Sequence, residues 1–157
     1  MTVSVMFVCL GNICRSPTAH GVFKSLVNEL GLQDQIIVES SGTGGWHIGE
    51  SPDKRATVFA ATRGFDLADL RAQQFKASDF DCFDYILAMD KQNLRDLEML
   101  RPEGYRGVLD LFLSFSAMKD EDVPDPYYGG DAGFEHVLDL VESASKGLLA
   151  HIQEQAS

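Results

Sequence analysis

Cysteine, basic residues and long apolar runs are all scarce in this sequence of 157 residues. The three cysteines, Cys9, Cys14 and Cys82, are too few for a disulfide framework and fit a reducing compartment such as the cytoplasm. Only 13 Lys and Arg stand against 24 Asp and Glu, so the formal net charge is -11. This charge argues against nucleic acid or an anionic membrane surface as a partner. No apolar stretch is long enough to cross a bilayer, and no basic residue precedes the apolar run at 2–10, as it would in a signal peptide.

Motifs for nucleotides and metal ions are also missing. Neither Gly-x4-Gly-Lys-Ser/Thr nor Gly-x-Gly-x-x-Gly occurs in the chain. The four histidines lack metal-ligand spacing; we expect His47 near the mouth of a candidate site and His20, His136 and His151 on helix surfaces. We therefore expect neither a cofactor nor a metal ion.

What the chain does have is a regular alternation of apolar runs of strand length with segments of helical periodicity. We predict strands near 3–8, 36–40, 83–89 and 107–112 and helices near 17–30, 51–64, 91–100 and 132–155, with a short helix around Ser78. This order predicts an α/β fold, with one domain over residues 1–157 built on a doubly wound, four-stranded parallel sheet and helices on both faces. Ligands bind at the carboxyl edge of such sheets.

The junction between the first strand and the first helix carries the string Cys9-Leu-Gly-Asn-Ile-Cys-Arg15-Ser16-Pro17. Its Gly-Asn pair tolerates positive φ, Ser16 is expected to cap the helix, and Pro17 is expected at the first helical position. Backbone N–H groups of a curled loop and a helix N-terminus together bind anions, and Arg15 adds a two-pronged donor for an oxyanion. Since the same positive field favours a thiolate, Cys9 is a candidate nucleophile beneath a bound phosphoryl group.

This string resembles the Cys-x5-Arg-Ser signature of the low-molecular-weight protein tyrosine phosphatases, residue for residue. The resemblance implies a protein-tyrosine phosphatase that uses no metal and hydrolyses phosphotyrosine on a protein, or a small aryl phosphate, through a phosphocysteine on Cys9. It implies that Arg15 binds phosphate and that the Ser16 hydroxyl donates to the Cys9 thiolate. The phosphate-binding loop would then comprise Leu10, Gly11, Asn12, Ile13, Cys14, Arg15 and Ser16. Similar proteins suggest a tyrosine kinase as one substrate.

A second motif, Asp125-Pro-Tyr-Tyr, stands between two prolines that stiffen the backbone of Asp125. It resembles the general-acid loop of the same family, which makes Asp125 the acid that protonates the leaving oxygen and the base that then activates water. Trp46, Tyr127 and Tyr128 would frame a slot for a flat aromatic ring. From the residues alone, a simple turn at Asp125 and ordinary packing of the three aromatic residues remain open.

Other residues fall at family positions around the expected site. Ser40, Asp53 and Asp90 are expected there, with Asn12 hydrogen-bonded to Ser40. The alternatives are a helix-start acid for Asp53 and a turn acid for Asp90. The sequence departs from the family at Leu70, where members commonly carry a histidine that supports the loop asparagine.

The remaining cysteines leave two readings open. Cys14 is expected to form a reversible disulfide with Cys9 that protects the nucleophile, or else to be a small buried hydrophobe. Cys82 is expected to fill space before the third strand. Two other functions stay as alternatives: an arsenate reductase of the same fold, which needs further redox cysteines, and a non-catalytic phosphate-binding module.

Overall fold

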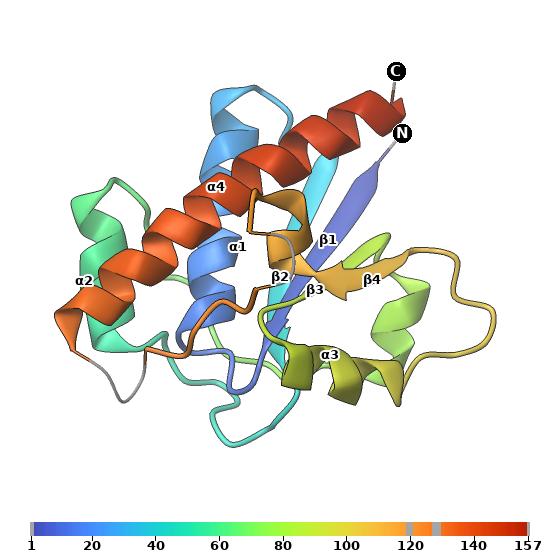
Figure 1. Ribbon diagram of the computed structural model, residues 1–157, viewed down its shortest axis with the longest axis horizontal. Helices are drawn as coiled ribbons and strands as arrows, with labels where there is room; N and C mark the ends of the chain where they lie inside the picture. Colours follow the sequence, from blue (N-terminus) through green and yellow to red (C-terminus); the bar gives the residue numbers. More distant parts are fainter. Residues whose placement is uncertain (1, 119–120, 127–129, 157) are drawn as a thin grey trace.

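The computed structural model describes residues 2–118, 121–126 and 130–156. Within them, four parallel strands form one sheet in the order β2-β1-β3-β4 (Figure 1). The strands are β1 (Val3–Cys9), β2 (Ile36–Gly42), β3 (Tyr85–Ala88) and β4 (Val108–Leu111). The predicted four-stranded parallel sheet is confirmed. Register places Cys9 beside Gly42, so both lie at the carboxyl edge of the sheet.

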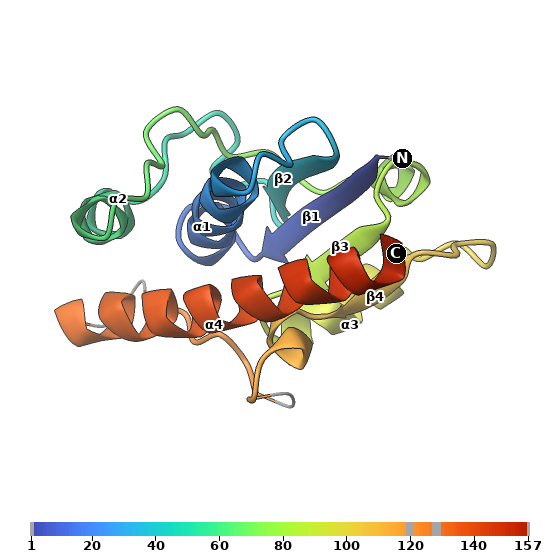
Figure 2. The ribbon, with the colours of Figure 1, turned by 90° about the horizontal axis from the view of Figure 1, so that it is seen from above.

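Helices cover both faces of this sheet, as predicted. Helices α1 (Arg15–Glu29) and α4 (Asp131–Ala156) pack together on one face, and α3 (Lys91–Glu98) and the short η1 (Ala77–Asp81) lie on the other. Helix α2 (Lys54–Thr62) packs beside α4, away from the strands, and η2 (Phe112–Phe115) directly follows β4 (Figure 2). None of the helices in the described part of the chain combines the length and apolar character needed to cross a membrane.

Strand β1 is buried on both sides. Val5, Phe7 and Cys9 face the layer of α1 and α4, while Met6 and Val8 face the opposite layer. All five side chains are at most 3% exposed. Burying each large apolar side chain contributes about 1.5–3 kcal/mol. The loop after β1 therefore starts from a firmly packed strand.

Helix α1 begins two residues earlier than predicted. Its first residue is Arg15, its N-cap is Cys14, and no side chain caps it, so the predicted cap by Ser16 is wrong. Pro17 is consequently the third helical residue, where its missing N–H still costs no helical hydrogen bond. The Ser16 hydroxyl bonds within the preceding loop instead.

The segment 72–75 runs beside the end of β2 and is hydrogen-bonded both to that strand end and to the 43–50 loop. The N–H of Gly42 donates to the Gln73 carbonyl at 2.9 Å, and the N–H of Phe75 donates to the Gly42 carbonyl at 2.7 Å. The N–H of Gly49 donates to the Ala72 carbonyl at 2.8 Å, which ties the 43–50 loop to the same segment.

Farther along the chain, Cys82 is exposed, so its predicted space-filling role is wrong.

Candidate active site

The turn after β1 closes into a tight loop because two positions permit it. Asn12 adopts φ +57°, the left-handed region that asparagine tolerates better than most residues. Gly42 lies directly against this loop: a Cβ there would come within 2.7 Å of the Leu10 carbonyl oxygen. Gly11 does not use positive φ, and the His47 ring lies where its side chain would project.

The Cys9 sulfur lies among hydrogen-bond donors. The Asn12 N–H donates to Cys9 Sγ at 3.2 Å, and Ser16 Oγ lies 3.0 Å from the same sulfur. Asn12 Nδ2 donates to Ser16 Oγ at 2.7 Å, and that oxygen also lies 3.2 Å from the Ser41 carbonyl. Ser16 therefore accepts from Asn12 and has its own proton free for the sulfur or for Ser41. These groups and the N-terminus of α1 together place partial positive charge around the Cys9 sulfur.

Arg15 is 3% exposed and joins three parts of the site. Its Nη1 donates to Asp90 Oδ2 at 2.6 Å and to the Val123 carbonyl at 3.1 Å. Its Nη2 lies 3.7 Å from Asp125 Oδ2. Burial alone would lower the pKa of Arg15, but Cys9, Asp90 and Asp125 outweigh it and raise the pKa. The guanidinium is therefore a fixed positive charge inside the site.

Asp90 and Asp53 each cap a helix beside the loop. Asp90 Oδ1 accepts the N–H of Asn93 at 2.7 Å at the start of α3, while its other oxygen binds the guanidinium. Asp53 Oδ1 accepts the N–H of Arg55 at 2.8 Å at the start of α2. The Asp53 N–H also donates to the Ile13 carbonyl at 2.7 Å. The Asp53 side chain is therefore a helix-start acid, which was one of the two possibilities left open by the sequence. Asp90 both caps α3 and binds the guanidinium of Arg15.

Asp125 reaches the site from a segment anchored on either side. The Val123 N–H donates to the Met89 carbonyl at 2.7 Å, and Pro126 lies against Gly133 of α4. The Asp125 side chain remains 40% exposed. Tyr127 and Tyr128, the predicted aromatic wall, lie outside the described residues.

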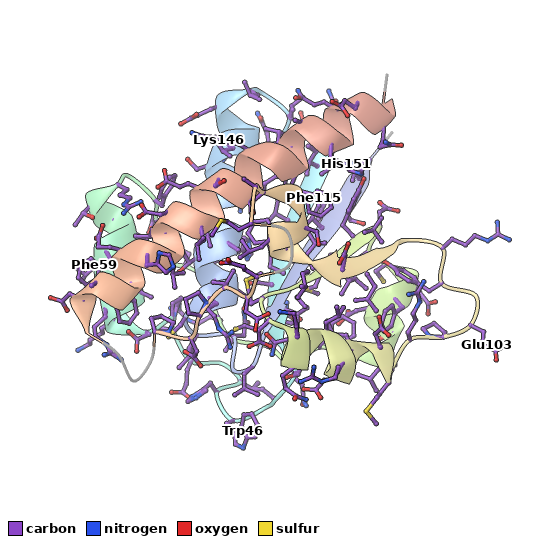
Figure 3. The ribbon with its side chains drawn as sticks, in the orientation of Figure 1. Trp46, Phe59, Glu103, Phe115, Lys146 and His151 are labelled. Atoms are coloured by element: carbon purple, nitrogen blue, oxygen red, sulfur yellow. The ribbon has the colours of Figure 1, made fainter. Side chains whose placement is uncertain are left out.

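A pocket of about 180 Å³ opens above the sulfur. It is lined by Cys9, Leu10, Gly11, Ile13, Cys14, Arg15, Trp46, His47 and Asp125. Trp46 is 71% exposed and projects from the edge of the molecule (Figure 3). The fold thus brings eight predicted site residues from three distant segments around one opening: Trp46, Asp125 and, from the loop, Cys9, Leu10, Gly11, Ile13, Cys14 and Arg15. In the described part of the chain no three His, Cys, Asp or Glu side chains form a group that could hold a metal ion.

Cys14 shares the pocket but has a different environment from Cys9. Burial, then the negative charge of Asp53 and the nearby Cys9, raises the pKa of Cys14. Its side chain packs with Ala56 and Phe134. Neither cysteine is in a disulfide in this structure, and the raised pKa keeps Cys14 a neutral thiol.

Sequence reasoning missed the support of the loop asparagine. Asn12 Oδ1 accepts the Gln73 N–H at 3.0 Å and its Nδ2 binds Ser16, so the predicted bond from Asn12 to Ser40 is wrong. Ser40 Oγ instead lies 2.9 Å from His20 Nδ1, and the Ser40 carbonyl accepts from Gln73 Nε2 at 2.9 Å. The sequence did carry one signal for His20: it stands four residues after Ser16, so both lie on the same face of α1. Gln73 lies in an irregular segment and gave no signal.

His20 is 5% exposed, so its predicted place on a helix surface is wrong. Burial, with a smaller effect of Lys24, lowers the pKa of His20 to about 4, and the imidazole is therefore neutral at pH 7. Leu70 is partly buried and packs against the main core.

This fold and site define an α/β protein that surrounds a thiol with anion-binding groups. Residues 4–157 match the family model "Low molecular weight phosphotyrosine protein phosphatase", and the chain belongs to this family. The protein is accordingly a protein-tyrosine phosphatase, as the resemblance in the sequence implied. The match favours this activity over the arsenate reductase and the non-catalytic module.

Three relatives illustrate the match. The low molecular weight protein-tyrosine-phosphatase of Streptomyces coelicolor is 47% identical over 159 residues, covering 99% of this chain and 96% of the relative. A crystal structure of the protein tyrosine phosphatase of Entamoeba histolytica, with Hepes in its active site, superposes with a TM-score of 0.94 at 37% identity, covering 99% and 100% of the chains. The Drosophila arginine phosphatase DARP superposes with a TM-score of 0.87 at 33% identity, covering 94% and 97%.

Proposed function

We propose that this protein hydrolyses phosphotyrosine on proteins through a phosphocysteine formed on Cys9. Arg15 binds the phosphate, and Asp125 acts first as general acid and then as general base. The observation that carries the proposal is the shared pocket of these three residues, in which the buried sulfur accepts the Asn12 N–H and lies 3.0 Å from Ser16 Oγ.

In the first step the loop amides and Arg15 hold the phosphate dianion against the sulfur. Asp90 and the Val123 carbonyl engage Nη1 of Arg15, which orients the remaining N–H groups of the guanidinium toward the oxyanion. The thiolate attacks phosphorus, the S–P bond forms, and the bond from phosphorus to the phenolic oxygen breaks. Asp125 gives its proton to that oxygen, so tyrosine leaves as a neutral phenol.

In the second step a water molecule attacks the phosphocysteine. Asp125, now a carboxylate, takes the proton from this water, the S–P bond breaks, and inorganic phosphate forms. The returning charge on Cys9 is met by the same donors, the N–H of Asn12 and the hydroxyl of Ser16. The enzyme thereby returns to its starting state.

The walls of the pocket support an aromatic substrate. Leu10, Ile13 and Trp46 present apolar surface at the opening, which suits the face and edges of a phenyl ring. Phosphoserine has no ring to lie against these walls, so we expect it to bind less well than phosphotyrosine. Phosphoarginine is the relevant competitor, because the Drosophila neighbour is described as an arginine phosphatase. A tyrosine kinase as substrate and a cytoplasmic location stay predictions.

The test compares turnover of phosphotyrosine, phosphoserine and phosphoarginine peptides in the presence of a chelator, and traps ³²P-labelled enzyme by acid quench. We expect turnover of phosphotyrosine to exceed that of the other two, and label on the wild type and Cys14→Ser but not on Cys9→Ser. We also expect Asp125→Ala to lose more activity on phenyl phosphate than on p-nitrophenyl phosphate, because the poorer leaving group needs the proton more. Label retained by Cys9→Ser, or equal losses on the two esters, would contradict the mechanism.

A further inference from the structure

A buried histidine outside the pocket is connected to the nucleophile through four intervening residues, each hydrogen-bonded to the next: Ser40, Gln73, Asn12 and Ser16. His20 lies on α1, and its Nδ1 is 2.9 Å from Ser40 Oγ on β2. Both residues are buried, at 5% and 6% exposed. In the mechanism above, neither one contacts the substrate.

The series continues from β2 into the loop. The Ser40 carbonyl accepts from Gln73 Nε2 at 2.9 Å, and the Gln73 N–H donates to Asn12 Oδ1 at 3.0 Å. Asn12 Nδ2 donates to Ser16 Oγ, which lies 3.0 Å from Cys9 Sγ. Each of these links joins groups in different structural elements or within the loop itself.

The orientation of the Asn12 side-chain amide determines whether the Ser16 proton is available to the sulfur. If its Nδ2 points at Ser16 Oγ, that oxygen is already an acceptor and has its proton available for the sulfur. The Gln73 N–H fixes this direction because it can bind only the oxygen end of the amide. Gln73 is in turn held at its side chain by Ser40, whose hydroxyl contacts His20.

We propose that His20 is a positioning residue for the nucleophile: by holding Ser40, it keeps Gln73 and Asn12 in the arrangement that directs the Ser16 hydroxyl toward Cys9. The inference rests on the proposed role of Cys9 as nucleophile. It goes beyond that role by assigning a function to a side chain that lies outside the pocket.

The first test is His20→Phe, which keeps a ring of similar shape and removes the hydrogen bond to Ser40. We expect kcat to fall by about three- to tenfold with little change in KM. We also expect the pH midpoint for alkylation of Cys9 by iodoacetate to move upward, because the thiolate loses part of its stabilisation. The charged groups around the sulfur, Arg15, Asp90 and Asp125, and Lys24 beside residue 20, are the same in every variant used.

Two conservative variants separate the hydrogen bond from the packing. Asparagine at this position places an amide where Nδ1 stands, whereas glutamine places its amide near the position of Nε2. His20→Asn should therefore recover most of the kcat and the alkylation midpoint of the wild type, and His20→Gln should resemble His20→Phe. Ser40→Ala, which breaks the same bond from the other side, should repeat the effect if His20→Phe folds poorly.

His151→Phe is the matched control for loss of a packed histidine. His151 lies on α4 with its ring 5.8 Å from Tyr85 and 5.2 Å from Phe115, near the C-terminal end of the helix and far from Trp46 (Figure 3). We expect this variant to lower Tm without moving the alkylation midpoint. A double-mutant cycle of His20→Phe with Gln73→Ala should show non-additive losses in kcat.

The inference is overturned if the alkylation midpoint and kcat are unchanged in both His20→Phe and Ser40→Ala. It is also overturned if His20→Asn is as impaired as His20→Phe, because packing rather than the hydrogen bond would then be responsible. Failure of the proposed function is distinguishable, since wild-type enzyme would then remain active after complete alkylation of Cys9.

Discussion

The inner part of the site and its mouth are built in opposite ways. The loop from Cys9 to Ser16 is contiguous in sequence, and its reactive side chains are buried, with Arg15 3% exposed and Ser16 fully covered. The mouth combines Trp46 and Asp125 from separate segments, and both remain substantially exposed. The buried loop can therefore hold charge in a fixed geometry, while the exposed mouth meets the variable part of a substrate. Substitutions in the two regions should change different kinetic constants.

The largest effect is expected from Cys9→Ser, because a serine hydroxyl is not ionised by the donors that stabilise a thiolate. We expect kcat on an aryl phosphate to fall by about 10⁴-fold or more. Cys14→Ser, five residues along the same loop, should keep most of the activity, since burial and Asp53 raise the pKa of Cys14 and leave it a neutral thiol. Steady-state assays of the two variants, with phosphate affinity as a check on folding, decide the matter. Equal losses would remove the distinction between the two cysteines.

Arg15→Lys should come next. A lysine cannot hold Asp90 and the Val123 carbonyl and still present a two-pronged donor to phosphate, so kcat/KM should fall by about 10²–10³-fold. The matched control is Arg63→Lys, because Arg63 also binds carboxylates, at 2.6 Å from Glu135, but joins α2 to α4 away from the pocket. This control should lose thermal stability and retain kcat/KM. A large loss of kcat/KM in the control would contradict the assignment of phosphate binding to Arg15.

His20 should make stability depend on pH. Its pKa is about 4 in the folded protein against 6.5 for a free histidine, so between these values the unfolded chain binds the additional proton. The free energy of unfolding should therefore decrease as pH falls from 6.5 to 4, by about 3 kcal/mol from this residue. Urea denaturation at about pH 7, 5.5 and 4.5 should show a smaller decrease in His20→Asn than in the wild type. Parallel curves for the wild type and His20→Asn would refute the expectation.

The smallest effect is expected at the mouth, from Trp46→Ala. Loss of an aromatic contact with the substrate ring should raise KM for an aryl phosphate by about three- to tenfold with kcat little changed. The inhibition constant of inorganic phosphate, which has no ring, should stay the same. A change in phosphate inhibition of similar size would show that Trp46 also shapes the phosphate-binding loop, and the contrast between mouth and loop would weaken.

The sequence predicted those parts of the molecule whose information is local. Apolar runs and helical periodicity placed the strands and helices because burial on one or two faces leaves a periodic pattern. The loop after β1 was predicted because its thiol, its guanidinium and its residue with positive φ, Asn12, lie within seven consecutive positions. At Ser16 local preference gave the wrong answer, because it predicted a cap of α1. The hydroxyl instead lies against Cys9, as the family resemblance implied, and accepts from Asn12.

Contacts that depend on the main chain of a distant segment were not predictable. The Gln73 N–H that holds Asn12 and the Val123 carbonyl that holds Arg15 would be present with almost any side chain at those positions. Ser40 was expected to bind Asn12, but it contacts His20 and Gln73. These contacts depend on how closely α1 and the 72–75 segment approach β2, which the sequence does not state. Such contacts follow from the assembled fold and leave no pattern along the chain.

The central place of β1 in the sheet has a consequence for local unfolding. The strand ends in the nucleophile, is hydrogen-bonded on both sides by β2 and β3, and is packed on both faces. Amide hydrogens in such a strand exchange with solvent only when the molecule opens globally. The reactive sulfur therefore belongs to the last cooperative unit to melt, and catalytic competence should persist in denaturant up to the main unfolding transition, even where the exposed loop around residues 43–50 has already frayed.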